Sequence, residues 1–200
     1  GSLMGGAIGA WIGCRLAGIK LWSFADALAP AMLLAQAIGR LGNYVNHELF
    51  GWPTDLPWGL QIESTNPAYP AGLPDGLLFH PTFLYEMIWN LIGVLIILVL
   101  ERMFHMRWGR AFAVYLVSYG LGRMWIESIR MDYSEIILGL RSNVLGALML
   151  ALLGVGMLVW FHRQHHDDEA SIYLPGRSPA ERMSSSAEVS AEDANLTPTP

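Results

Sequence analysis

The chain has 200 residues, of which 53% are hydrophobic and only 14% are charged, whereas an average soluble domain carries roughly 25% charged residues. The formal net charge is −5, and most of the negative balance falls within residues 163–200, so the remainder is nearly neutral and gives no argument for nucleic-acid binding. The single cysteine, Cys14, excludes an intrachain disulfide.

Apolar segments along the chain are long enough to cross a lipid bilayer as helices. They comprise residues 3–19, 24–41, 80–100, 110–130 and 142–161. The first is rich in Gly and Ala, which suits close helix packing in lipid. The sequence therefore predicts an all-α fold, a polytopic membrane helix bundle with five spans over residues 1–162. Because the sequence opens on apolar residues without Met, we expect further spans to precede Gly1.

The charges between these segments predict their orientation. The basic residues gather in alternate connections and after the last segment: Arg15, Lys20, Arg102, Arg107, Arg110 and Arg163. The other connections hold Asp55, Glu63, Asp75, Asp132 and Glu135 against Arg141 alone. Since basic loops stay cytoplasmic, the first segment enters from outside and the C-terminus is expected in the cytoplasm.

Two regions outside the spans have their own composition. Residues 51–79 are rich in Pro, Gly and Trp and predict an outer-face loop at the level of the lipid headgroups. Residues 163–200 are rich in Ser, Ala, Glu and Pro and predict a disordered cytoplasmic tail. We interpret the HHDDE run at 165–169 as part of this solvated tail rather than as a metal site, and no other cluster has the spacing of one.

Polar residues are concentrated in GRLGNYVNHELFG, at the end of the second segment. Arg40 offers a planar fork suited to phosphate or carboxylate. Asn43 and Asn46 would share one face of a helix, and Glu48 could pair with Arg40 or hold a neighbour. The glycines Gly39, Gly42 and Gly51 would permit turns and close approach of a ligand. The alternative is an ordinary membrane exit, where polar residues are common.

A second cluster, HPTFLYE, opens the third segment. Pro81 fits the first turn of a helix. His80 lies just before it, and Tyr85 and Glu86 lie one turn deeper. Interfacial His and Tyr are common in membrane proteins, but the carboxylate of Glu86 requires a partner or water.

A third cluster, YGLGRMWIESIRMD, ends the fourth segment. Tyr119, Arg123 and Glu127 are four residues apart and should lie on one helix face, with Arg130 three residues beyond. Such a column must face a bundle interior or a cavity rather than lipid. Its alternative role is an ion-pair ladder that locks helices together.

All three clusters fall at the predicted outer side, where they would form a polar chamber with at least two arginines. Such a chamber suits an anionic headgroup whose acyl chains remain in the bilayer. The zinc-peptidase, nucleophile-elbow and P-loop motifs are absent from the sequence. The alternatives are a transporter or channel for an anionic solute and a structural membrane subunit.

The first motif resembles the signature of the bacterial prolipoprotein diacylglyceryl transferase family, Gly-Arg-x-Gly-Asn-aromatic-aliphatic-Asn-x-Glu-x-x-Gly, with all fixed positions filled. HPTFLYE is similar to the family's His-Pro-x-x-Leu-Tyr-Glu. YGLGRMWIESIR is similar to its Tyr-Gly-x-x-Arg-x-x-x-Glu-x-x-Arg. The resemblance covers residues 1 to about 162.

This resemblance implies a multi-pass protein of the bacterial plasma (inner) membrane with its active site toward the outer leaflet. The family moves a diacylglyceryl group from phosphatidylglycerol to the lipobox cysteine thiol in a prolipoprotein signal peptide, forms a thioether and releases glycerol phosphate. It uses no metal and no organic cofactor. The expected partners are phosphatidylglycerol, the prolipoprotein and membrane lipid, and not nucleic acid.

The family's chemistry assigns roles to the three clusters. Two guanidiniums would stabilise the departing phosphate, asparagines would bind headgroup hydroxyls, glutamates would orient the arginines, and a phenol would relay the thiol proton. The catalytic candidates are Arg40, Asn43, Glu48, Tyr119, Arg123 and Glu127. The substrate-binding candidates are Gly42, Asn46, Gly51, His80, Tyr85, Glu86 and Arg130.

The chain departs from the family at its first span, where a His-Gly-Gly motif is usual. Here Gly1-Ser2 stands where that motif should be ending. His80 and His47 are candidates to replace its histidine. We expect the full-length protein to be active, whereas activity of these 200 residues alone stays open.

Overall fold

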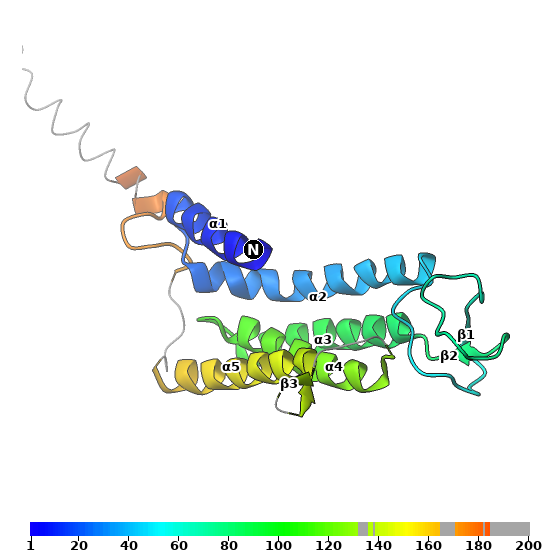
Figure 1. The fold of residues 1–200 in the computed structure, drawn as a ribbon. Helices are drawn as coiled ribbons and strands as arrows, with labels where there is room; N and C mark the ends of the chain where they lie inside the picture. The colour runs from blue at the N-terminus through cyan, green and yellow to red at the C-terminus, as the bar shows by residue number, and fades with distance from the viewer. Residues whose placement is uncertain (132–135, 138, 165–170, 182, 185–200) are drawn as a thin grey trace, which may run out of the picture.

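The computed structural model describes residues 1–131, 136–137, 139–164, 171–181 and 183–184, and these residues are mostly helical (Figure 1). The long helices are α1 (Ser2–Ala17), α2 (Leu21–Val45), α3 (Thr82–Phe104), α4 (Arg110–Ile129) and α5 (Ser142–Gln164). The short strands are β1 (Leu60–Gln61), β2 (Leu78–Phe79), β3 (Ile136–Ile137) and β4 (Leu140–Arg141). A helix therefore lies at each of the apolar segments, and the two hairpins were not expected.

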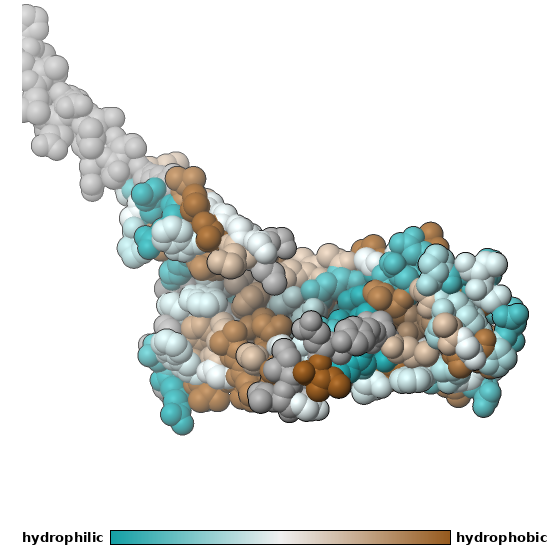
Figure 2. Space-filling view, in the orientation of Figure 1, coloured by the Kyte–Doolittle hydropathy of each residue, from teal (hydrophilic) through white to brown (hydrophobic). Residues whose placement is uncertain are grey.

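Helices α2, α3 and α5 are long and apolar enough to cross a membrane, which makes three candidate spans among the described residues. Helix α1 has 16 residues, and α4 carries the charged side chains of Arg123 and Glu127. The structure thus supports a membrane protein with three such spans. Figure 2 shows brown apolar surface over parts of the bundle, and teal hydrophilic residues both at its ends and in an area between them.

The bundle is built from two helix pairs, α2 with α3 and α4 with α5 (Figure 1). Helix α4 also packs on α2 and on α3, and these contacts join the two pairs. Its core lies where α2, α3 and α4 meet, and Leu33 and Ile97 there are fully buried. Helix α1 contacts only α2 among the described elements. The end of α2 that carries Arg40 therefore lies away from α1, beside the loop between α2 and α3.

Glycines allow α4 and α5 to pack with their backbones in close contact. A Cβ atom added at Gly120 would lie 2.6 Å from the carbonyl oxygen of Ala147, and one added at Gly154 would lie 2.7 Å from that of Ala113. Small residues at such crossings are the usual means of helix association in lipid. This contact fixes α5, and with it Asn143, against the face of α4 that carries Arg123.

The start of α4 is positioned by a side chain of α2. The Asp26 carboxylate accepts hydrogen bonds from the backbone N–H groups of Gly109 at 2.8 Å and Phe112 at 3.0 Å. The first N–H groups of a helix have no partner within the helix, and a carboxylate also complements the positive end of the helix dipole. Asp26 therefore caps α4 from a neighbouring helix.

The loop of residues 51–79 forms a small packed unit at one end of the bundle (Figure 1). Ile62 and Phe79 of the loop are buried together with the preceding Phe50, and Tyr69 packs edge-on against Phe79 with ring centroids 5.5 Å apart. Strands β1 and β2 pair antiparallel through Leu60 and Phe79. The loop thus has an apolar core of its own beside the predicted interfacial tryptophans.

The segment after α5 differs from the expected disorder where the structure describes it. Tyr173 forms an antiparallel bridge with Ile19, and Leu174 N–H donates to the Gly18 carbonyl at 2.8 Å. The Lys20 ammonium donates to the Ser171 carbonyl at 2.6 Å. These backbone partners, which the composition does not reveal, order the segment at the α1–α2 junction. The HHDDE run, Asp132, Glu135 and residues 185–200 lie outside the described residues.

Candidate active site

The motif GRLGNYVNHELFG continues α2 rather than leaving it, because Arg40 to Val45 form its last turns. Gly42 is helical, and no atom lies within 4 Å of a Cβ added there. The turn that follows instead uses His47 and Leu49 in the left-handed region, at φ 49° and 57°. The expectation that Gly39 and Gly42 would make turns is therefore wrong.

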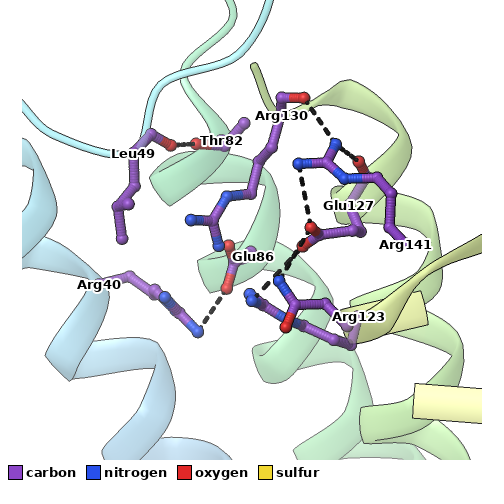
Figure 3. A network of polar contacts seen from close by, with 9 residues as sticks. Arg40, Leu49, Thr82, Glu86, Arg123, Glu127, Arg130 and Arg141 are labelled. Atoms are coloured by element: carbon purple, nitrogen blue, oxygen red, sulfur yellow. Dashed lines mark hydrogen bonds and ion pairs between the residues drawn. The ribbon is translucent and has the colours of Figure 1, made fainter. Parts of the chain in front are cut away.

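Arg40 forms an ion pair with Glu86 across the α2–α3 interface, with 2.6 Å between Nη2 and Oε2 (Figure 3). The sequence allowed Glu48 as the partner of Arg40, and this interpretation is wrong. After Val45 the chain turns outward, so Glu48 is exposed and accepts a hydrogen bond from Asn46 Nδ2 at 3.3 Å. Glu86, a substrate-binding candidate from the sequence, thus holds the guanidinium of Arg40.

Helix α4 presents Arg123 and Glu127 on one face, as their spacing predicts, with 3.4 Å between Nη2 and Oε2. Glu127 is fully buried. Its other carboxylate oxygen, Oε1, lies 3.2 Å from Arg141 Nη2 and accepts a hydrogen bond from Asn143 Nδ2 at 3.0 Å. Glu127 is therefore held from α4, from β4 and from the start of α5.

Arg130 follows directly after α4, is buried, and extends its side chain toward Glu86 (Figure 3). Its carbonyl accepts a hydrogen bond from Arg141 Nη1 at 3.0 Å. The cluster combines Arg40, Arg123, Arg130 and Arg141 with two carboxylates, Glu86 and Glu127 (Figure 3). Four positive charges against two negative ones leave a formal charge of +2, which favours an anion.

The motif HPTFLYE forms a network beside this cluster. His80 Nδ1 lies 3.1 Å from the Tyr85 hydroxyl, which also accepts a hydrogen bond from Trp58 Nε1 at 3.0 Å. Tyr85 stacks on Trp125 of α4, with ring centroids 6.1 Å apart. The network ties the loop of residues 51–79 to the start of α3.

Gly51 lies where the loop of residues 51–79 meets α3 and α4. Its N–H donates to the His80 carbonyl at 2.9 Å, and it bridges to Arg130. A Cβ atom there would meet His80 Cβ and the Ile129 carbonyl oxygen at 2.9 Å each. These contacts explain the glycine by packing, whereas its role in binding substrate stays a prediction.

A cavity of about 530 Å³ opens beside the arginines and lies within the usual size of ligand sites. Its lining comprises Arg40, Leu49, Tyr119, Arg123, Arg130, Ser142, Asn143, Gly146, Ala147 and Leu150. A second, smaller cavity is lined by Arg40, Glu86, Trp89, Asn90, Tyr119, Gly122, Arg123 and Ile126. Guanidiniums from α2 and α4 therefore share both cavities with the Tyr119 phenol.

The predicted site residues divide into two groups. Five of the predicted residues line these cavities: Arg40, Glu86, Tyr119, Arg123 and Arg130. The other predicted residues line neither of the two cavities: Gly42, Asn43, Asn46, Glu48, Gly51, His80, Tyr85 and Glu127. Glu127 nevertheless contacts Arg123 from behind, and Glu48 lines a separate cavity of about 420 Å³ that shares Leu49.

Sequence reasoning missed Arg141, Asn143 and the buried Asn90. The signal for Arg141 was present, since it is the one basic residue in connections that are otherwise acidic. Asn143 and Asn90 lie within apolar segments, where a side-chain amide needs a hydrogen-bonding partner. Within the described ranges, no three His, Cys, Asp or Glu side chains are grouped so that they could hold a metal ion.

Comparison with known proteins identifies the family. The family model of prolipoprotein diacylglyceryl transferases matches residues 1–160. A phosphatidylglycerol–prolipoprotein diacylglyceryl transferase of Leifsonia xyli subsp. xyli is 59% identical over 94% of this chain and 56% of its own length. Proteins of the same name are 45% identical in Bifidobacterium longum, over 85% of this chain and 58% of theirs, and 49% identical in Streptomyces griseus, over 80% and 47%.

The chain spans about half the length of these curated relatives. The match nevertheless includes the three polar motifs and the helices that carry them. The chain belongs to the prolipoprotein diacylglyceryl transferase family.

Proposed function

We propose that the protein transfers the diacylglyceryl group of phosphatidylglycerol to the cysteine thiol of a prolipoprotein. The observation that carries this proposal is the cavity shared by Arg40 of α2 and Arg123 of α4. It lies at one end of a membrane bundle and has the positive charge that a phosphate requires. The family's name supports the same pair of substrates.

The reaction is a displacement at one carbon of phosphatidylglycerol. It is the carbon of the diacylated glycerol unit that carries the phosphate. The thiolate sulfur forms a bond to this carbon while the bond between the carbon and the phosphate oxygen breaks. The electron pair of the broken bond leaves with glycerol phosphate, and the thioether stays on the protein substrate. Negative charge therefore develops on the departing oxygen, where the enzyme must stabilise it.

Arg40 and Arg123 are the groups that would stabilise the departing phosphate. Glu86 and Glu127 hold their guanidiniums at 2.6 Å and 3.4 Å, so both are positioned before substrate arrives. Removal of one preorganised donor of this kind costs on the order of 10²–10³-fold in rate. Arg130 adds a third positive group on the same cavity wall.

The attacking thiol must lose its proton, since the thiolate is the nucleophile. A cysteine near arginines has a lowered pKa, so the positive field of the cavity favours the thiolate. The Tyr119 phenol lines the cavity and can relay the proton. His80 lies outside the lining, beside Tyr85, and is the alternative acceptor.

We place the cavity toward the outer leaflet of the bacterial plasma membrane, with five crossings and a cytoplasmic C-terminus. Basic residues at the α1–α2 and α3–α4 connections support this orientation. The loop with Trp52 and Trp58 lies at the opposite end of the bundle and suits the headgroup region.

Mass spectrometry of a lipobox peptide incubated with phosphatidylglycerol vesicles and the complete protein tests this function. We expect the peptide to gain one diacylglyceryl group, with release of glycerol phosphate. An Arg102→Ala variant, changed in the last turn of α3 away from the cavity, should match the unmodified protein. An unmodified peptide would reject the proposal, and solute flux without a covalent product would indicate a transporter instead.

A further inference from the structure

We propose that Arg141 is a positioning residue that fixes Glu127 and through it the guanidinium of Arg123. This inference rests on the proposed function and assigns a role to a residue outside the three sequence motifs. Arg141 belongs to β4, immediately before α5, whereas Glu127 and Arg123 belong to α4. It joins two elements whose relative position shapes the cavity wall.

Arg141 contacts the last turn of α4 at three atoms. Its Nη1 donates to the carbonyl oxygens of Glu127 at 2.9 Å and Arg130 at 3.0 Å. Its Nη2 lies 3.2 Å from Glu127 Oε1. A planar guanidinium can satisfy a carboxylate and two carbonyls at once because its donors form a rigid fork.

These contacts divide the Glu127 carboxylate between two sides (Figure 3). Oε1 faces Arg141 and Asn143, whose amide donates to it at 3.0 Å. Oε2 is buried without a hydrogen bond and faces Arg123 Nη2 at 3.4 Å. The orientation set at Oε1 therefore determines the attraction that Arg123 experiences at Oε2.

The burial of Glu127 makes this arrangement sensitive to Arg141. A fully buried carboxylate requires compensation of its charge. Without Arg141, Arg123 would become the nearest compensating cation and would be drawn from the cavity toward Glu127. Arg141 does not itself line the cavity, so its effect on a bound phosphate would pass through Glu127 and Arg123.

The experiment compares Arg141→Ala, Arg141→Lys and the control Arg102→Ala in the complete protein, reconstituted in phosphatidylglycerol vesicles. We expect Arg141→Ala to lower kcat by on the order of 10²-fold, the usual effect of misplacing a catalytic group by about 1 Å. The KM for the peptide should stay within about 3-fold, because no thiol or peptide contact is lost. Arg141→Lys keeps the charge without the fork and should recover part of kcat.

A double-mutant cycle separates positioning from general destabilisation. In a Glu127→Gln background the carboxylate charge is gone, so adding Arg141→Ala should lower kcat by less than about 3-fold. If the double variant instead loses kcat by the full product of the two single-variant losses, Arg141 does not act through Glu127 and the inference is overturned. The same holds if Arg141→Lys has a normal thermal midpoint and a normal kcat.

Direct binding distinguishes this inference from the proposed function. Calorimetry with glycerol phosphate should show Kd at least about 10-fold weaker for Arg141→Lys than for the unmodified protein. If the unmodified protein binds this anion but transfers nothing, the proposed reaction fails while the positioning role stands. If Arg141→Lys binds as tightly as the unmodified protein, or if the unmodified protein binds nothing, the positioning role fails.

Discussion

Arg40 and Glu86 face each other from α2 and α3, and their 2.6 Å contact is the shortest ion pair between the two helices that the described residues provide. The Glu86 side chain is 9% exposed and that of Arg40 is 22% exposed. The pair is therefore shielded from water on the carboxylate side and open to the cavity on the guanidinium side.

Glu86→Gln should impair the protein in both stability and rate. The variant keeps the shape of the side chain and removes its charge, so Arg40 loses the group that holds it. We expect a loss of about 1–3 kcal/mol in the free energy of unfolding, below the full cost of breaking a completely buried pair. Thermal unfolding in detergent and the rate of peptide lipidation measure the two effects. An unchanged rate would remove Glu86 from the site.

Arg40→Ala and Arg123→Ala should each abolish thiol alkylation while the protein persists in the membrane. Each removes a guanidinium from the cavity that receives the phosphate, which costs on the order of 10²–10³-fold. Quantitative blotting of membranes and mass spectrometry of the lipobox peptide provide the two readouts. Normal transfer by both variants contradicts the assignment, and loss of the protein itself indicates a structural role.

Gly120→Ala should loosen the contact between α4 and α5. The added Cβ would lie 2.6 Å from a backbone oxygen of Ala147, so a helix must shift, and such overpacking costs about 1–3 kcal/mol. Gly156→Ala is the matched control, since a Cβ there has no atom within 4 Å. The thermal midpoint should fall for the first variant and hold or rise for the second. Equal midpoints would show that the close approach is not required.

Asp26→Ala should destabilise the start of α4. Two backbone N–H groups would lose the carboxylate that caps them from α2, and loss of a cap costs about 0.5–2 kcal/mol. Asp26→Asn keeps one acceptor oxygen and should lose less. Hydrogen exchange at residues 109–112 would report the effect locally. Protection in both variants equal to that of the unmodified protein would contradict this role.

The sequence predicts the helices well because their signal is local. Long apolar runs identify α2, α3 and α5, and the spacing of Arg123 and Glu127 predicts their shared face of α4. The end of α2 was misjudged because glycines within a lipid-facing helix need not make turns. The strands were not predicted from the sequence because each has two residues, too few for a periodic pattern.

The pairing of charges could not be read from spacing alone. Glu86 follows Arg40 by 46 positions, and only the packing of α2 on α3 selects it over the nearby Glu48. Arg141 was counted from the sequence only among the charges of the connections between spans, whereas its side chain reaches the buried Glu127. Residue types thus predicted a cluster of arginines and glutamates correctly, while the partners depend on tertiary structure.

The return of residues 171–174 to Gly18–Lys20 has a practical consequence for protein engineering. A fluorescent protein fused directly after Gln164 would remove the partner of the α1–α2 junction and leave those backbone groups to water. A fusion placed beyond Ser184 would spare it. The fusion site beyond Ser184 is therefore the better choice, even though the composition of the sequence after α5 suggests that it could be removed.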